Sequence, residues 1–331
     1  MVKHSETSAL RTPALSRADL DPVAHRRTDD AWLKAAWSDP RTRVLLLEAG
    51  DPGTHGWQAL HSRPSLARVT DDGDRPRLVF VAPEEAPAGE WYLLGVDDEE
   101  RAYFAVRLTG ESTQHPAATL PNTRGASLRA DGPLLDERDS GLLTQAVALG
   151  NWHATHPCCP RCGASTRSRS AGHVRVCLAE GREHFPRLDP AVIMLVHDDD
   201  PDGIERCLLA HNPQWPGNRF SVLAGYVEPG ESLEQAVVRE VAEEVGVTVT
   251  QPQYVASQPW PFPRSLMFGF TAQAVGATPR TDEAEIERVR WMSRPELAAA
   301  AASGEVVLPG RVSIARGLIE HWFGGELPGQ W

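Results

Sequence analysis

Three glutamates in the C-terminal third of the chain have the spacing of a cation-binding helix face. They are Glu240, Glu243 and Glu244, in the segment GYVEPGESLEQAVVREVAEEVGV at residues 225–247. Because a helix turns by about 100° per residue, their i, i+3, i+4 spacing places the three carboxylates within an arc of roughly 100°. Such carboxylates repel one another, and a divalent cation that prefers oxygen ligands, such as Mg²⁺ or Mn²⁺, removes the repulsion. The pattern indicates a metal site, and the plainer interpretation is a solvated charged face.

The helix that would carry these glutamates has a start signal and a stop signal. Ser232 followed by Gln235 fits a capping box, which predicts that the helix begins at Ser232. Gly246 fits the position just past its end. A further face carries valines that we expect to pack against a core: Val238, Val241 and Val245.

A second group of residues with metal-binding chemistry lies about 60 residues upstream of this helix. Cys159 and Cys162 form a Cys-x-x-Cys pair, and Cys177 follows after fourteen further residues. Structural zinc takes four ligands, commonly two such pairs, so we predict Zn²⁺ on these three thiolates. Cys207 is most simply a small apolar strand residue.

The composition limits the environment and the partners. With 331 residues the chain has the length of two domains. A formal charge of −12 argues against a broad basic surface for nucleic acid, but not against a polyphosphate that a metal ion neutralises. We find no apolar run long enough for a membrane span and no signal-peptide core. We therefore expect a cytoplasmic protein without membrane contact, whose cysteines bind metal rather than form disulfides.

The elements that must position these groups are mostly strands. Short apolar runs bounded by turn residues predict strands, and the 3.6-residue apolar spacing of 139–156 predicts a helix that leads into the cysteines. The polar stretch 109–127 is predicted to be a linker, and a short amphipathic segment is expected at 31–37. The predicted strands are 44–50, 76–83, 91–96, 101–108, 191–200, 205–212, 253–260, 265–275 and 289–293, with a closing helix near 311–323.

The acidic segment as a whole resembles the Nudix hydrolase box. Gly225, Glu231 and the run from Arg239 to Val247, which includes Gly246, match every defined position of that motif. The resemblance implies an α/β/α sandwich with divalent metals on a loop–helix–loop, and hydrolysis of a nucleoside diphosphate linked to another group. It also implies that Glu231 and Arg239 support the metal-binding glutamates.

The same resemblance implies how the reaction proceeds. Metal ions neutralise a pyrophosphate, lower the pKa of a bound water, and hold the attacking water and the leaving group in line. A carboxylate in hydrogen-bond reach takes the proton of that water. We favour Glu244 as this base and Glu240 as the firmest metal ligand, with Glu243 beside them. Glu285 matches a downstream glutamate that adds to metal binding and catalysis, and its plainer interpretation is a surface acid.

A second motif points to the substrate. SQPWPFPRS, at residues 257–265, resembles the signature of the NADH pyrophosphatase branch of Nudix enzymes. That branch implies cleavage of NAD(H) to nicotinamide mononucleotide and AMP, removal of 5′ NAD caps from RNA, and a homodimer. The resemblance assigns substrate contacts to Tyr226, Phe185, Ala224, Ala315, Arg129, Gln258, Pro259, Trp260, Pro261, Phe262, Pro263, Arg264 and Ser265. For Tyr226 and Phe185 the plainer alternative is a buried core aromatic.

The cysteine cluster departs from this branch at one ligand. Where the branch has a second Cys-x-x-Cys pair, Glu180 replaces the last cysteine. Either Glu180 or His184 completes the site, or Cys158 or His156 does, or zinc has been lost and only the ribbon remains. Any zinc here is expected to be structural, because nothing nearby provides an open catalytic position.

These observations predict an α+β chain with four parts. They are a strand-rich Nudix-like domain at 1–125, a linker helix at 126–156, a zinc-ribbon motif at 157–188 and a catalytic Nudix sandwich at 189–331. Two alternatives to NAD(H) hydrolysis are a Nudix hydrolase for ADP-ribose or dinucleoside polyphosphates, and a non-catalytic NAD-sensing module. The intact 257–265 segment disfavours the first, and the complete set of box glutamates disfavours the second.

Overall fold

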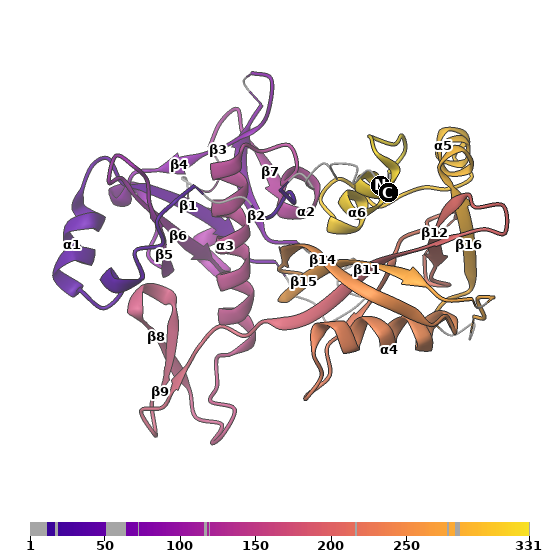
Figure 1. Ribbon diagram of the computed structural model, residues 1–331. Coiled ribbons are helices and arrows are strands. Elements are labelled where there is room, and N and C mark those ends of the chain that lie inside the picture. The colour runs from indigo at the N-terminus through magenta and orange to yellow at the C-terminus, as the bar shows by residue number, and fades with distance from the viewer. Residues whose placement is uncertain are drawn as a thin grey trace. The chain divides into compact units, whose positions relative to one another are not determined.

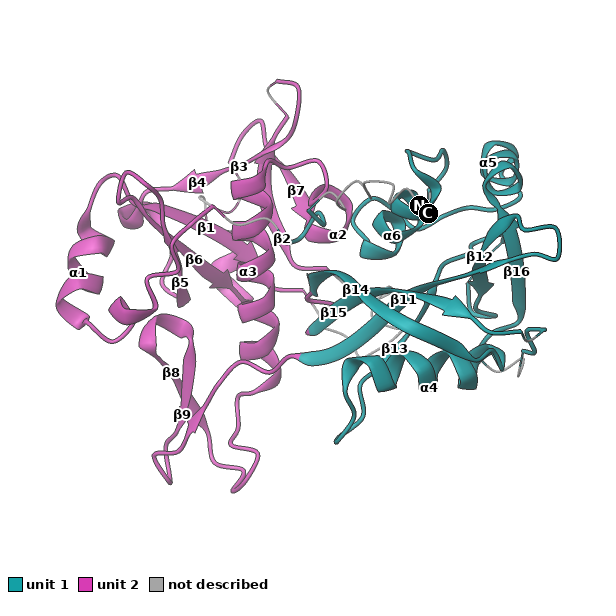
Figure 2. Ribbon diagram, viewed as in Figure 1, with its two compact units in different colours: residues 1–16, 189–259, 265–331 teal, residues 17–188, 260–264 magenta. Residues whose placement is uncertain are grey.

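The computed structural model describes residues 12–16, 19–50, 64–71, 73–115, 118, 120–215, 217–276, 278–281 and 285–330. It divides into two compact units (Figure 2). Unit 1 consists of residues 189–259 and 265–331, with the described N-terminal residues 12–16. Unit 2 consists of residues 17–188 and the short segment 260–264. No helix in the described part of the chain has both the length and the apolar character needed to cross a membrane.

Unit 2 is built on a seven-stranded mixed sheet. Its main path runs β3 (Arg77–Leu78), β2 (Leu66–Thr70), β1 (Arg43–Glu48), β6 (Ala102–Leu108) and β5 (Glu90–Val96), with β4 (Phe80–Val81) on β1 and β7 (Arg124–Ser127) on β2. The central pair β1 and β6 is parallel, and the other pairs are antiparallel. The β5–β6 hairpin turns at residues 97–101.

Three α-helices accompany this sheet: α1 (Asp30–Ser38), α2 (Leu128–Asp131) and α3 (Glu137–Thr155). The long helix α3 packs on β1 and β5 (Figure 1). It begins where the Asp136 carboxylate accepts the N–H of Asp139, which satisfies one of the free amides of the first turn. Close packing continues along the helix, because a Cβ on Gly150 would lie 3.2 Å from the Leu47 side chain.

A separate three-stranded antiparallel sheet follows α3; Cys177 lies on it, and Cys159 and Cys162 lie between α3 and its first strand. It consists of β8 (Thr166–Arg169), β9 (Val174–Cys177) and β10 (Glu183–His184), with β9 in the centre. The register pairs Thr166 with Cys177 and His184 with Arg175.

Unit 1 contains a six-stranded mixed sheet. Its path runs β14 (Val249–Trp260), β15 (Ser265–Ala274), β11 (Asp189–Asp199), β12 (Glu205–His211) and β16 (Arg288–Ser293), with β13 (Leu223–Tyr226) paired to β11. The long β11 and β15 are parallel, so both units have a parallel pair inside their mixed sheets.

Two cores form on the opposite faces of this sheet, because successive strand residues point to opposite sides. Val192 and Met194 pack with helix α4 (Leu233–Val245). Ile193 packs on the other side with α5 (Arg294–Ser303) and α6 (Ile314–Phe323). Figure 1 shows α4 on one side of the strands and α6 on the other. The predicted α/β/α sandwich of the C-terminal region is confirmed.

The buried stripe of α4 differs in one residue from the sequence-based expectation. Val237, Val241 and Val245 are fully buried, whereas Val238 is 38% exposed. The i, i+4, i+8 row faces the sheet, and Val238 lies about 100° round the helix from Val237. Its assignment to the core was therefore wrong.

Other differences concern short or irregular elements. The predicted strand 76–83 is split into β3 and β4, and the predicted linker 109–127 contains a 3₁₀-helix (Gly110–Gln114) and β7. Helix α5 and strand β2 were not predicted. The alanine-rich sequence of α5 has little amphipathic contrast, and β2 has only five residues.

Candidate functional site

The glutamate helix begins and ends where the sequence predicts. The Ser232 hydroxyl accepts the N–H of Gln235 at 3.2 Å, and the Gln235 side chain accepts the N–H of Ser232 at 2.8 Å. Gly246 follows the helix with φ 65°, the left-handed conformation that glycine adopts without steric cost. The start fixes the rotation of the helix, and therefore the direction of its carboxylates.

Arg239 is the centre of an ion-pair network on this helix. Its guanidinium binds both carboxylate oxygens of Glu231, at 2.6 and 2.9 Å. One further nitrogen, Nη1, lies 2.9 Å from Glu240 Oε1 and 2.9 Å from Glu243 Oε2. Nη2 also donates to the Tyr226 carbonyl at 2.9 Å. One arginine thus fixes three carboxylates and the end of β13.

Glu231 positions this arginine from the loop before the helix. Its carboxylate accepts two hydrogen bonds from Arg239 and one from the N–H of Glu228, at 3.0 Å. The Arg239 hydrogen bonds lower the pKa of Glu231 and raise the pKa of Arg239, so both groups are charged at neutral pH. A fork-shaped guanidinium suits this bidentate contact, which a lysine cannot make.

Gly225 lies directly against the Glu240 carboxylate. A Cβ on Gly225 would overlap the Cδ and both oxygens of Glu240. Glycine is therefore required by a close approach, not by its backbone conformation. The β13 backbone at Gly225 packs against the Glu240 carboxylate and limits its position.

The negative charges of neighbouring acidic side chains destabilise the charged form of Glu240. Its pKa is raised, first by burial and then by the negative charges of Glu243 and Glu285, and Arg239 only partly opposes this. A divalent cation would supply the missing charge, and carboxylate oxygens suit Mg²⁺ or Mn²⁺. The donor set fits such an ion. The oxygens are not gathered around one point, because in the described residues only the three thiols form a group with all ligand atoms within 4.8 Å.

Tyr226 connects this acidic centre to the end of the 257–265 segment. Its ring is 42% exposed, and its hydroxyl lies 3.3 Å from the Ser265 Oγ. A buried core role is therefore excluded for Tyr226. Ala224 is exposed on β13, whereas Ala315 is buried at the start of α6.

The first part of the 257–265 segment is held inside unit 1. The Gln258 side chain is completely buried and its Nε2 donates to the Val312 carbonyl at 2.6 Å. The Ser257 carbonyl accepts the Ser16 hydroxyl at 2.7 Å. The first contact connects β14 to the residues before α6, and the second connects it to the described N-terminal residues.

The middle of the segment, residues 260–264, belongs to unit 2. There the Asn151 amide on α3 donates to the carbonyls of Pro261 and Pro263, at 2.9 and 3.2 Å. The Arg129 guanidinium lies over the Phe262 ring, 4.2 Å from its centroid, and over Trp260 at 5.5 Å. Burial lowers the pKa of Arg129 to about 10. Proline has no backbone N–H to donate, so the carbonyls of Pro261 and Pro263 are the backbone groups that Asn151 can bind.

The three cysteines predicted to bind zinc lie together at the cysteine-bearing sheet. All three Sγ atoms lie within 4.8 Å of one another, and Cys162 and Cys177 are 3.5 Å apart. Backbone N–H groups of Cys162 and Arg161, with smaller help from the thiol of Cys162 and the side chain of His184, lower the pKa of Cys159 to about 6. The thiolate is the form that binds a metal, so the cluster fits Zn²⁺.

Two family models match this chain. The NUDIX domain matches residues 187–309, and the NADH pyrophosphatase-like rudimentary NUDIX domain matches residues 33–152. Relatives align over nearly all of the sequence. NAD-capped RNA hydrolase NudC of Mycobacterium bovis BCG Pasteur is 38% identical over 94% of both chains. NudC of Mycobacterium tuberculosis H37Ra is 37% identical over 94% of both. Human NAD-capped RNA hydrolase NUDT12 is 33% identical over 93% of this chain and 72% of its own length.

The chain belongs to the NADH pyrophosphatase branch of the Nudix hydrolase family. The predicted family and mixed α+β fold are confirmed, and the acidic segment is a Nudix box in a Nudix domain. The strand-rich unit 2 contains the second, rudimentary Nudix domain that the sequence led us to expect.

Phe185 lies outside the Nudix box, in the residues that follow β10. Its ring is 58% exposed, so it is not a core aromatic. Leu188, three residues later, is exposed to a similar extent. An exposed aromatic ring is available to a ligand or to a second copy of the chain, which leaves its predicted role open to test.

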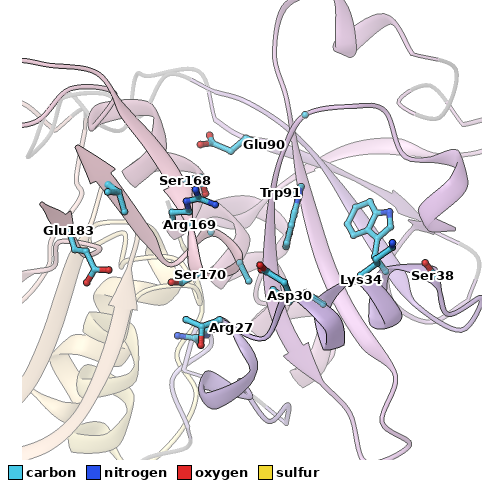
Figure 3. Close-up of a pocket in the computed structure, with 17 residues that line it drawn as sticks. Arg27, Asp30, Lys34, Ser38, Glu90, Trp91, Ser168, Arg169, Ser170 and Glu183 are labelled. Atoms are coloured by element: carbon cyan, nitrogen blue, oxygen red, sulfur yellow. The ribbon is translucent and has the colours of Figure 1, made fainter. Parts of the chain in front are cut away.

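The rudimentary Nudix unit has a pocket of its own, with a volume of about 930 Å³ (Figure 3). Lys34 and Trp37 of α1 and Trp91 of β5 form part of its wall, and Arg169 and Glu183 come from the cysteine-bearing region. Basic and acidic side chains both line it, and all lining residues belong to unit 2. None of the predicted Nudix site residues lies in it.

Two groups that position the predicted site had no signal in the sequence. Asn151 lies inside an ordinary amphipathic helix, about 110 residues from the prolines that it binds. Ser16 lies 241 residues from Ser257. A single sequence contains no pattern for such long-range pairs. Arg129, which is predicted to contact the nucleotide, lies over the rings of Trp260 and Phe262.

Proposed function

We propose that this Nudix enzyme hydrolyses the pyrophosphate bond of NAD(H) to nicotinamide mononucleotide and AMP, and removes 5′ NAD caps from RNA. The observation that carries the proposal is the acidic centre, in which Arg239 fixes Glu231, Glu240 and Glu243 beside Tyr226. The likeness to proteins named NAD-capped RNA hydrolases, over more than nine-tenths of the chain, supports the substrate.

The chain's own residues have distinct roles in this proposal. Glu240, Glu243, Glu244 and Glu285 would hold Mg²⁺ or Mn²⁺, which would neutralise the pyrophosphate and acidify a water. Glu244 accepts the proton of that water. Arg239 and Glu231 keep the ligands in place, and Gly225 lets the Glu240 carboxylate lie against β13.

Substrate recognition is assigned to the aromatic and loop residues. The exposed Tyr226 ring stacks on a base, and Ser265, whose hydroxyl lies near the Tyr226 hydroxyl, limits its position. Ala224 and Ala315 offer backbone groups, and residues 258–264 with Phe185 and Arg129 complete the proposed substrate set. Gln258 and Arg129 also hold segment 257–265 in place, given the contacts they make.

A structural Zn²⁺ on Cys159, Cys162 and Cys177 belongs to the same proposal. Their proximity and the lowered pKa of Cys159 support it. The homodimer, the cytoplasmic location and the three domain boundaries at 125, 156 and 188 stay predictions. Gel filtration with light scattering would test the dimer.

The catalytic assignment is tested by Glu244→Gln. With NADH and Mn²⁺, we expect at least about a hundred-fold loss of kcat, as general base removal commonly causes, with little change in folding. Glu234→Gln is the matched control, because Glu234 is exposed on the first turn of the same helix. AMP release that survives the Glu244 change would refute the role of Glu244 as base.

The substrate assignment is tested by comparing NADH, NAD-capped RNA and ADP-ribose at equal concentrations. The proposal expects nicotinamide mononucleotide and AMP from NADH, and RNA with a 5′-monophosphate from the capped strand. Faster turnover of ADP-ribose than of either would replace it with the broader Nudix alternative. No turnover of any substrate would favour a ligand-sensing module.

A further inference from the structure

The cysteine cluster offers three ligands, whereas structural zinc is bound by four. Cys159 and Cys177 each begin a tight turn of similar form. Gly163 donates its N–H to the Cys159 carbonyl, and Gly181 donates to the Cys177 carbonyl, both at 2.9 Å. The first turn supplies Cys162 as a second thiolate, but the equivalent position of the second turn is Glu180. The missing ligand must therefore come from another side chain.

The strand register brings His184 to the face that carries Cys177. His184 pairs directly with Arg175, and Arg175 lies two residues before Cys177 on β9. Directly paired residues point to the same side of a sheet, as do residues two apart on one strand. His184 and Cys177 are thus diagonal neighbours, a spacing that long or ring side chains can span.

The imidazole of His184 is also the group with an unused ring nitrogen. Its Nε2 is buried and has no hydrogen-bond partner in the described structure. The His184 side chain interacts with the thiol of Cys159, and no ring nitrogen of His184 lies within 4.8 Å of all three sulfurs, so a small side-chain rotation is needed to complete a site. A buried polar atom without a partner costs free energy, and a metal ion at the thiols would satisfy it. We propose that His184 is the fourth ligand of a Cys₃His zinc site formed with Cys159, Cys162 and Cys177.

The other candidates are engaged or point elsewhere. The Glu180 side chain is exposed and its carboxylate pairs with Arg182 at 3.6 Å, while its backbone N–H donates to the Cys177 Sγ at 3.4 Å. His156 uses Nδ1 for the Trp152 carbonyl and the Thr155 hydroxyl. Cys158 is exposed and adjacent to the buried Cys159.

The chemistry also favours an imidazole. Three thiolates with a neutral histidine leave the Zn²⁺ site less negative than three thiolates with a carboxylate. Cys₃His is a common ligand set for tetrahedral structural zinc, and imidazole nitrogen is among the ligands that zinc prefers.

The test measures zinc directly in the full-length protein. Zinc content is determined by elemental mass spectrometry, and affinity by competition with a chromogenic chelator. For His184→Ala we expect affinity at least about ten-fold below the wild type, because even outer partners of a zinc ligand have effects of this size. Glu180→Gln, the matched control, should bind zinc like the wild type, and Cys159→Ser serves as the reference for a lost ligand.

A rescue variant separates coordination from a purely structural role. His184→Cys should recover tight binding and, with Co²⁺ in place of Zn²⁺, show a stronger thiolate-to-metal absorption band from the added thiolate. Unchanged affinity in His184→Ala would overturn the proposal, as would zinc loss in Glu180→Gln.

The inference rests on the proposed structural zinc, and the two can fail separately. Wild-type protein without zinc overturns both, whereas full zinc retention by His184→Ala overturns only the role of His184. NADH hydrolysis with Mn²⁺ is measured on the same samples, so that a failure of the proposed catalytic function is seen independently of zinc.

Discussion

Gly225 limits where the Glu240 carboxylate can lie, although it has no side chain of its own. The backbone of β13 contacts that carboxylate, and Arg239 of the same helix donates a hydrogen bond to it. The carboxylate is thus fixed from two sides, which suits the metal-ligand role proposed for it. The Nudix resemblance identifies both residues, but only the structure gives the reason for the glycine.

The first prediction concerns Gly225→Ala. The new Cβ would displace the Glu240 carboxylate, because the two would overlap. A shift of about 1 Å at a catalytic group can cost on the order of a hundred-fold in rate. We expect kcat/KM for NADH to fall by about that factor and the Mn²⁺ requirement to rise. Gly325→Ala is the control, because nothing lies within 4 Å of a Cβ there and its activity should be unchanged.

At the scale of elements, helix α3 has two tasks in unit 2. Its first turn binds β3 through Asp139, and its last turns bind segment 260–264 through Asn151. Periodicity predicted this helix almost to its bounds, as capping residues did for α4. Its polar contacts could not be predicted, because each depends on a partner far along the chain. Short strands such as β7 were missed for the same reason: they are defined by pairing, not by local sequence.

Loss of the Asn151 amide should weaken unit 2. In Asn151→Ala, the buried Pro261 and Pro263 lose their shared donor. Leaving buried carbonyls unpaired costs roughly 1–3 kcal/mol, so the free energy of unfolding in urea should fall by about that amount. Gln145→Ala, at a partly exposed site on the same helix, should change it by less than about 0.5 kcal/mol. Equal effects of the two changes would contradict this role.

The stability contribution of Asp139 should depend on pH. Burial raises its pKa from 3.8 to about 6, so the folded protein holds this proton more tightly than the unfolded chain. The contribution is fully present below the unfolded pKa and is lost as pH rises through about 6. In Asp139→Asn this dependence disappears. Relative to the wild type, the variant should gain on the order of 1–2 kcal/mol between about pH 4 and 7.

Urea unfolding of the wild type and Asp139→Asn at both pH values measures the difference in their free energies of unfolding. The contributions of other titrating groups are the same in both proteins and cancel. Glu137→Gln is the control, because Glu137 is exposed in the same turn. A constant difference between wild type and Asp139→Asn would show that the carboxylate is not buried in its charged form.

At the scale of the whole molecule, charge and substrate have the same sign. The chain carries a formal charge of −12, and both NADH and RNA are anions. A metal ion held by the glutamates can bind a pyrophosphate, but it does not attract a long phosphate backbone. Whether the protein binds only the NAD cap or also the RNA that follows it should therefore appear in the salt dependence of kcat/KM.

We expect the ratio of kcat/KM for NAD-capped RNA to that for NADH to stay level or rise between about 50 and 200 mM salt. Screening reduces the repulsion between the acidic protein and the RNA. A protein that grips several phosphates would instead lose affinity steeply over this range. Initial rates for both substrates at the two salt concentrations give the ratio, and a steep fall would reveal a basic RNA-binding patch.

The assignment of residues 260–264 to unit 2, with both flanks in unit 1, affects how the chain can be divided. A fragment of residues 189–331 would lack Asn151, which binds the Pro261 and Pro263 carbonyls, and Arg129, which lies over the rings of Trp260 and Phe262. Such a fragment should aggregate, because its apolar rings have no cover. Supplying the upstream half as a second chain should restore solubility. The protein is therefore better suited to split-protein complementation than to modular excision of its catalytic half.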